Sequence, residues 1–397
     1  MIIEIDNSIV EYLEKNKNKI NYTNKVVVAI NSIIKSFAIK KHIMFANIEI
    51  LEFLSENQLI EKFNKNVVLW LIQRYSSVGM FVNSVDKRVV AYKSKLRSDI
   101  YYLNDRYYVP IEKFISINCT QLLTENDKDA EFFVDIATEV NNKVFKFTNI
   151  SIEYDGRSYS GGNIETVASE VVRKFNISLC IADSDKDYKD DDKGSTLIKA
   201  IEVVKKYEKN NVISLLPLKV REKENLLPPI LYIRILNHSK KFLDLLNKKL
   251  ESEELLRFID IKDGFKAKKF NSVNEKWHKL YDDFLIECDA QGILNCSLNE
   301  LLTKDEDYIF LNGIFDKATN KVDTYLFREG VNNRLKQMKE IDSIPSEALK
   351  AEEENLELSR NIFECLPDYL KRDWIEIGKT IIQWCCRISD EEMSVFS

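Results

Sequence analysis

Two clusters of acidic residues in the middle of the chain each follow a short apolar run. Glu125 and Asp129 come after TQLL, and Asp183 and Asp185 come after ISLCIA. Side chains two positions apart in extended backbone point the same way, so Asp183 and Asp185 are expected to converge on one ligand. Carboxylate oxygens without histidine or cysteine favour Mg²⁺ or Mn²⁺ over zinc. A cation held there would stabilise charge on a phosphoryl oxygen or activate water.

Each cluster taken alone also has an ordinary structural explanation. Residues 125–129 have the pattern of a helix N-terminus, where acidic side chains complement the helix dipole. Residues 183–192 have the composition of a solvated loop. Both clusters, however, follow an apolar strand and precede a helical pattern. This combination favours a metal site at the ends of two neighbouring strands, with Glu125 facing the two aspartates.

The elements that would position these residues alternate along the chain. Between residues 117 and 265, apolar runs such as CTQLLTE, ISLCIADSD and NVISLLPL are separated by amphipathic helical patterns. That alternation predicts an α/β domain with a mostly parallel sheet. Residues 1–116 are expected to form a mixed α+β region, mainly helical, with one strand-like stretch, KRVVAYKSK. Residues 266–397 are expected to form a helical domain.

The central region resembles the TOPRIM domain of topoisomerases, primases and OLD-type nucleases. TQLLTENDKDAEFFVDIA is similar to the TOPRIM strand that ends in a glutamate, and ISLCIADSDKD is similar to its Asp-x-Asp strand. The resemblance implies a Rossmann-like fold in which Glu125 is the catalytic glutamate and Asp183 and Asp185 hold the metal. Asp129 matches an additional acidic position of OLD-type members.

Two later segments extend the resemblance. LLPLKVREKENLLPP is similar to the strand and Glu-Asn-Leu segment of OLD-type proteins, which makes Glu224 a further acidic residue of the site. IDIKDGFKAKK offers Lys262 as the basic residue that such nucleases place near the scissile phosphate. The implied function is Mg²⁺- or Mn²⁺-dependent hydrolysis of DNA or RNA (including tRNA) in anti-phage defence.

The resemblance also bears on partners. OLD-type nucleases usually carry an ABC-type ATPase in the same chain, and this sequence has no such domain. A separate ATPase or sensor protein is therefore an expected partner. The alternative is a non-catalytic TOPRIM-like module that acts as a regulatory or structural partner of such an ATPase. The helical flanking regions offer apolar surface for a homo-oligomer.

Charge is unevenly distributed and permits a polyanionic partner. The chain has 58 Lys and Arg against 64 Asp and Glu, a net charge of −6, yet residues 1–116 carry 17 basic against 12 acidic residues. One stretch of this region interleaves basic residues with five tyrosines, which suits phosphate contacts and base stacking. A strand pair with a solvated basic face explains it equally well. Its basic residues are Lys87, Arg88, Lys93, Lys95, Arg97 and Arg106.

Other patterns exclude or weaken competing functions. The seven cysteines form no CxxC pair, which argues against a disulfide scaffold or a zinc site and for a reduced, cytoplasmic location. No apolar run approaches the ~18 residues of a membrane span. Gly378-Lys379-Thr380 ends like a P-loop, but its surroundings predict an amphipathic helix with Trp374 and Ile381 on the core side. The stretch DYKDDDK (187–193) is interpreted as a native loop.

Overall fold

The computed structural model describes residues 1–94, 99–159, 163–228, 240–249, 252–272, 274–313, 328–341 and 344–389. It is a mixed α/β structure with parallel sheets, as expected. The contacts divide the chain into two compact units. Unit 1 comprises residues 1–182, 198–216 and 376–397, and unit 2 comprises residues 183–197 and 217–375. The three consecutive domains expected from the sequence remain a prediction.

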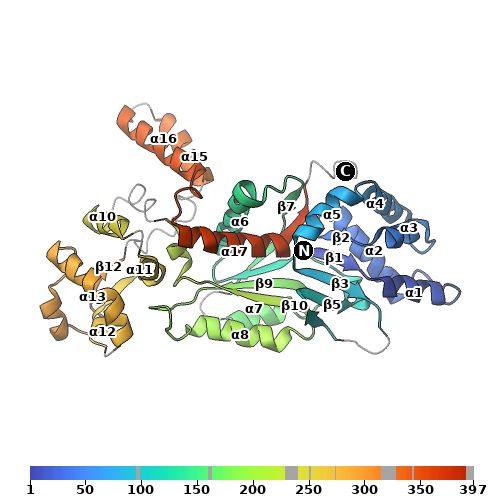
Figure 1. Ribbon diagram of the computed structural model, residues 1–397, viewed down its shortest axis with the longest axis horizontal. Helices are drawn as coiled ribbons and strands as arrows, with labels where there is room; N and C mark the ends of the chain where they lie inside the picture. The colour runs from blue at the N-terminus through green and yellow to red at the C-terminus, as the bar shows by residue number, and fades with distance from the viewer. Residues whose placement is uncertain are drawn as a thin grey trace. The chain divides into compact units, whose positions relative to one another are not determined.

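The first part of unit 1 is built on a five-stranded sheet (Figure 1). Its strand order is β2-β1-β3-β5-β4, and every pairing is parallel except that of β4 with β5. The strands are β1 (Ile2–Ile5), β2 (Ile43–Phe45), β3 (Arg88–Tyr92), β4 (Tyr101–Leu103) and β5 (Arg106–Pro110). The sequence predicted β3 and offered a strand pair, now seen as β4 and β5, as one explanation of the basic stretch, but it did not predict β1 or β2. The sheet is accompanied by α1 (Asn7–Lys15), α2 (Lys25–Ala38), α3 (Ile48–Glu56), α4 (Lys62–Gln73) and α5 (Tyr75–Ser84).

The second sheet of unit 1 contains three of the predicted apolar runs, which form β6, β9 and β10, together with the polar strand β8, which was not predicted. Its order is β10-β9-β6-β8, and β6 runs parallel to both β8 and β9. The strands are β6 (Gln121–Thr124), β8 (Asp155–Ser158), β9 (Ile177–Ala182) and β10 (Val212–Pro217). All six residues of β9 are buried. Because every residue of this strand is buried, its sequence is a continuous apolar run and does not alternate between apolar and polar residues.

Helices connect these strands on both faces of the sheet. The connections are α6 (Asp127–Val140), α7 (Ile164–Val171) and α8 (Ser195–Tyr207). Figure 1 shows α7 and α8 on one side of the sheet and α6 on the other. A further two-stranded sheet pairs β7 (Ile150–Ile152) with β13 (Cys386–Ile388), so residues far apart in sequence complete unit 1.

Unit 2 is mainly helical. Its antiparallel strand pair is β11 (Gly264–Lys266) and β12 (Ile309–Asn312). Its helices are η3 (Lys223–Leu226), α10 (Lys240–Lys248), α11 (Glu253–Phe258), α12 (Ala267–Phe270), α13 (Glu275–Ala290), η4 (Leu298–Thr303), α15 (Arg328–Lys339) and α16 (Ser346–Arg360). The last long helix, α17 (Asp368–Cys385), begins in unit 2 and ends in unit 1. None of the described helices combines the length and the apolar composition needed to cross a bilayer.

Candidate active site

The carboxyl ends of β6 and β9 lie where the second sheet reverses its strand order. Leu123 of β6 pairs in parallel with Cys180 of β9. The chain goes from β6 to β8 on one side and then returns to β9 on the other. Open α/β sheets bind ligands at the carboxyl ends of the strands at such a reversal. Glu125 and Asp183 are the first residues after these two strands, as the sequence predicted.

The turn that carries Asp183 and Asp185 belongs to unit 2 and is fixed by its middle residue. Ser184 is buried, and its Oγ donates a hydrogen bond to the carbonyl oxygen of Val220 at 2.6 Å. The backbone N–H groups of Ser184 and Asp185 both donate to the carbonyl oxygen of Arg221, at 3.1 and 3.0 Å. Asp185 adopts a left-handed φ of 53°. These contacts hold the Asp-x-Asp backbone against the segment that follows β10.

The contacts of Asp187 anchor the start of the acidic loop, residues 187–193, within unit 2. Its carboxylate forms ion pairs with both Arg221 and Lys269. Its carbonyl oxygen accepts a hydrogen bond from the hydroxyl of Tyr281 at 2.7 Å. The same Arg221 also pairs with Asp260 at 3.0 Å. The stretch 187–193 is thus an integral part of unit 2, and its first aspartate already has two cationic partners.

Glu222, Glu224 and Lys262 form the neighbouring part of the site. Glu224 is 8% exposed, and its Oε1 lies 3.9 Å from Nζ of Lys262. Burial raises the pKa of Glu222 to about 7, and the nearby carboxylates of Glu224 and Asp260 add to this effect. Burial acts to lower the pKa of Lys262, but Glu224 and Glu222 outweigh it, and the charge of Asp183 contributes in the same direction, so the pKa is raised.

Lys262 stands on a turn that Asp260 caps. The Oδ1 atom of Asp260 accepts the backbone N–H groups of Asp263 and Gly264, at 2.8 and 3.2 Å. Gly264 has a φ of 79°, and a Cβ at this position would overlap the carbonyl oxygen of Leu311. Glycine is therefore required for the turn to pass this close to β12. The turn fixes the backbone on which Lys262 sits.

Four of the predicted residues meet electrostatically in unit 2. Burial raises the pKa of Asp185, with Asp260 acting in the same direction, while the positive charges of Arg221 and Lys262 oppose the rise. Lys262 in turn interacts with Asp183 and pairs with Glu224. The structure therefore brings Asp183, Asp185, Glu224 and Lys262 into one cluster of mixed charge.

The two predicted ligands that follow β6 belong to unit 1. Asp129 is buried, and its Oδ2 accepts the backbone N–H of Asn126 at 3.1 Å. This is the helix-capping role that the sequence offered as the ordinary explanation for the residue, at the start of α6. Glu125 is half-buried. The part that Glu125 plays in the site stays a prediction from the sequence.

The donor chemistry of the cluster in unit 2 fits a hard cation. Its acidic ligands are all carboxylates, which suit Mg²⁺ or Mn²⁺. Within the described ranges, no three His, Cys, Asp or Glu side chains are arranged so that they could hold a metal ion. The metal site therefore remains a prediction.

Sequence reasoning missed three residues of this cluster: Arg221, Glu222 and Asp260. A weak signal was present, because Glu222 stands two positions before Glu224, and Asp260 two positions before Lys262. Arg221 had no comparable signal, since a single arginine after an apolar run is common on protein surfaces.

The basic stretch of unit 1 is largely engaged in internal contacts. Arg88 is 9% exposed, lies 3.2 Å from Glu4, and donates to the carbonyl oxygens of Val82 and Val85. Lys93 pairs with Glu112. These contacts favour a structural role for Arg88 and Lys93.

Two other basic residues of the stretch, Lys87 and Arg106, are less constrained. Arg106 is partly exposed and lies 3.9 Å from Glu4, and Lys87 is half-buried. Lys95 and Arg97 lie outside the described residues. The tyrosines stack across strands: the rings of Tyr101 and Tyr108 are parallel within 3°, with centroids 4.8 Å apart. Ring stacking of this kind supports the strand-pair explanation of the stretch.

The P-loop alternative is excluded by the position of Gly378 in the middle of α17. A Cβ on Gly378 would lie 2.7 Å from Cβ of Val140 at the end of α6, so the glycine permits close helix packing. Lys379 pairs with Asp86 at 2.6 Å. The predicted core residues of this helix, Trp374, Ile377, Ile381, Trp384 and Cys385, are all buried.

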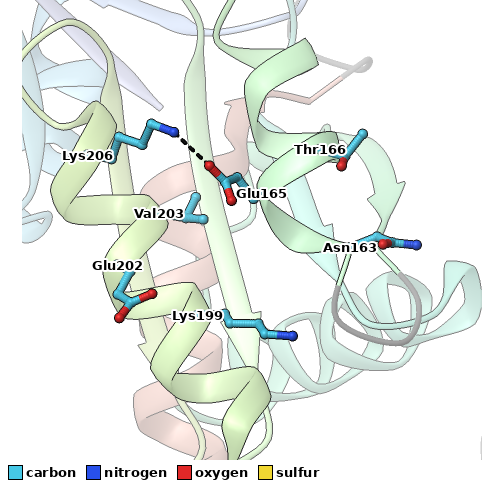
Figure 2. A pocket seen from close by; sticks show the side chains of 7 residues that line it. All are labelled: Asn163, Glu165, Thr166, Lys199, Glu202, Val203 and Lys206. Carbon is cyan, nitrogen blue, oxygen red and sulfur yellow. Dashed lines mark hydrogen bonds and ion pairs between the residues drawn. The ribbon is translucent and has the colours of Figure 1, made fainter.

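A polar groove of about 480 Å³ lies between α7 and α8. Figure 2 shows Glu165 and Lys206 meeting across it, and their ion pair measures 2.6 Å. None of the predicted catalytic residues lines this groove. Its lining consists of Asn163, Glu165, Thr166, Lys199, Glu202, Val203 and Lys206.

Neither protein-family models, nor curated proteins, nor solved structures gave a match to this chain.

Proposed function

We propose that this protein is a Mg²⁺- or Mn²⁺-dependent nuclease with a TOPRIM-like catalytic centre. The observation that supports the proposal most strongly is the cluster of Asp183, Asp185, Glu224 and Lys262 in unit 2. The Asp-x-Asp turn directly follows β9, at the point where the sheet reverses its order. Carboxylates that could hold a divalent cation, beside a cationic side chain, suit the stabilisation of charge on a phosphoryl oxygen.

Each residue has a defined task in the proposed reaction. A water oxygen attacks phosphorus, the bond to one ester oxygen breaks, and the products are a phosphomonoester and a free hydroxyl. Asp183 and Asp185 would hold a divalent cation, which supplies Lewis-acid stabilisation when bound. Lys262 donates its N–H groups to a non-bridging oxygen, where charge develops. The resemblance adds Glu125 as a further carboxylate.

The direct test incubates the full-length protein with labelled DNA duplex, single-stranded DNA, RNA and tRNA, in Mg²⁺, Mn²⁺ or EDTA. We expect metal-dependent cleavage that falls by about 10²–10³-fold in Asp183→Asn, Asp185→Asn and Glu125→Gln. Asp190→Asn is the matched control, since Asp190 lies in the same acidic loop, is 70% exposed and pairs only peripherally with Lys276. Equal cleavage by the wild type and the Asp183 variant would refute the catalytic assignment.

A second candidate is a non-catalytic module that regulates a separate ATPase. The ion pairs around Arg221 favour it, because Asp187 and Asp260 are already neutralised within the protein. In that case the cluster would stabilise unit 2 and would not catalyse a reaction. Binding of an ABC-type ATPase or sensor, with no cleavage of nucleic acid in the complex, would support this candidate. A role in anti-phage defence is proposed by analogy with OLD-type nucleases and is tested by phage infection of cells that express the protein.

A further inference from the structure

We propose that Arg221 is the positioning residue of this site, which fixes the Asp-x-Asp turn relative to the turn that carries Lys262. The inference rests on the proposed function and names a residue that the resemblance does not assign. Arg221 contacts both of these segments, and all the residues involved belong to unit 2.

The backbone of Arg221 holds the first segment. Its carbonyl oxygen accepts the N–H groups of both Ser184 and Asp185, at 3.1 and 3.0 Å. Its own N–H donates to the carbonyl oxygen of Arg257 at 2.8 Å, which ties residue 221 to the end of α11. The left-handed Asp185 is thus held by a backbone that is itself fixed.

The side chain of Arg221 joins the two segments. One side of the guanidinium pairs with Asp187, two residues beyond Asp185, and the other donates to Asp260 at 3.0 Å. Asp260 uses its second oxygen to cap the Lys262 turn. The Arg221 side chain is only 13% exposed, and the carboxylates of Asp187 and Asp260 are 17% and 12% exposed. An ion pair this sheltered is weakly screened, so it constrains geometry better than a surface pair.

Only a guanidinium can make these contacts together. Its planar fork presents donors in fixed, divergent directions, and here they reach Asp187, Asp260 and, at 3.6 Å, Glu222. The ammonium of lysine is a point charge on a flexible stem and cannot span both carboxylates with the same geometry. Without the guanidinium, the partly buried carboxylates of Asp187 and Asp260 would lose the positive charge that they share. The two turns would then move apart.

The test compares Arg221→Lys and Arg221→Gln with Arg257→Lys. Arg257 is a matched control because it is also in unit 2, is 11% exposed and forms a buried ion pair with Asp373 at 2.6 Å. Among the described residues its side chain donates to the carbonyl oxygens of Lys219 and Tyr369 and to neither turn, and the substitution leaves in place the backbone carbonyl that accepts from Arg221. Circular dichroism and thermal unfolding first establish which variants fold. If Arg221→Gln does not fold, Asp187→Asn replaces it in the comparison, because this substitution removes one of the ion pairs of Arg221.

The decisive readout is hydrogen exchange without metal or nucleic acid. We expect the amides of residues 184–187 and 263–264 to exchange about tenfold faster together in Arg221→Lys, with little change in Arg257→Lys. Mn²⁺ binding, measured by electron paramagnetic resonance, is expected to weaken by about 10–100-fold in the same variant. The kcat for an oligonucleotide should fall by about 10²-fold while KM changes little, since a shift of 1 Å in a catalytic group has this effect.

The outcomes separate the two proposals. Unchanged exchange in both turns, or an equal effect of Arg257→Lys, would overturn the role of Arg221 whether or not the protein cleaves nucleic acid. Absence of cleavage and of Mn²⁺ binding in the wild type would instead overturn the proposed function. Faster exchange confined to the two turns would still support the positioning role in that case.

Discussion

Glu222 makes the stability of the protein depend on pH in a direction opposite to that of most glutamates. Its carboxyl is buried beside Glu224 and Asp260, and its pKa is about 7 instead of the usual 4.5. A raised acid pKa means that the folded protein keeps a proton which the unfolded chain has released. The contribution of Glu222 to the stability of the protein is therefore most favourable below pH 4.5 and becomes less favourable as pH rises towards 7.

The magnitude follows from the size of the shift. Each pKa unit corresponds to about 1.4 kcal/mol, so a shift from 4.5 to about 7 corresponds to a penalty on the order of 3 kcal/mol above pH 7. Glu222→Gln removes the titrating group and retains an oxygen that can cap η3. We expect the variant to be more stable than the wild type by up to about 3 kcal/mol at pH 8, with the gain vanishing near pH 4.5.

The assay is urea unfolding in EDTA at several pH values between 4.5 and 8, followed by tryptophan fluorescence. The buried Trp277 and Trp374 lie in unit 2 and report on its unfolding. Glu306→Gln, an exposed site in the same unit, controls for the general loss of one negative charge. A stability difference that is independent of pH, or that grows towards acid, would show that the carboxyl of Glu222 is not held in its neutral form by burial.

Three further substitutions test packing and charge. Gly194→Ala places a Cβ in overlap with the side chain of Asp185, so we expect a stability loss of about 1–3 kcal/mol and weaker Mn²⁺ binding, measured by urea unfolding and paramagnetic resonance. Gly378→Ala should destabilise unit 1 by a similar amount, and Val140→Ala should restore part of the loss in a double-mutant cycle. Arg88→Gln leaves buried partners without a donor, so we expect about 2–4 kcal/mol lower stability by urea unfolding.

The controls for these substitutions are two residues of unit 1. Gly79→Ala adds a Cβ whose nearest neighbour is a Phe45 ring atom 3.9 Å away, in the interior of α5, and should be neutral or slightly stabilising. Lys87→Gln, next to Arg88 in sequence, should leave stability within about 0.5 kcal/mol. A Gly194 variant as stable as the wild type, or an Arg88 variant no worse than that of Lys87, would contradict the packing described above.

Three strands of the second sheet, β6, β9 and β10, could be predicted because each lies in an apolar run, whereas the polar β8 (DGRS) carries no such signal. ISLCIA is such a run, and the acidic residues that follow it stand where the chain leaves the sheet. The first sheet could not be predicted in the same way. β1 and β2 contain four and three residues, which is too short for any periodicity to distinguish them from helical or irregular sequence.

The candidate site shows the same division. Asp183, Asp185, Glu224 and Lys262 were predicted from local patterns and from a resemblance, and in unit 2 Lys262 interacts electrostatically with the other three. Arg221 and Asp260 were missed because their partners are distant in sequence: 34 residues separate Arg221 from Asp187, and 39 separate it from Asp260. A charged residue that is paired by tertiary contacts has the same local sequence as one that faces solvent.

The pairing of β7 with β13 sets a constraint on synthesis. Ile150–Ile152 is translated more than 230 residues before its partner Cys386–Ile388. The hydroxyl of Thr120 is likewise made long before the carbonyl oxygen of Trp384, to which it donates a hydrogen bond. At ribosomal rates the delay is on the order of tens of seconds. During this time the edge of β7 is unpaired and open to other strands. The nascent chain is therefore most vulnerable to aggregation while unit 2 is being made, and an early stop codon within α17 would leave that vulnerability permanent.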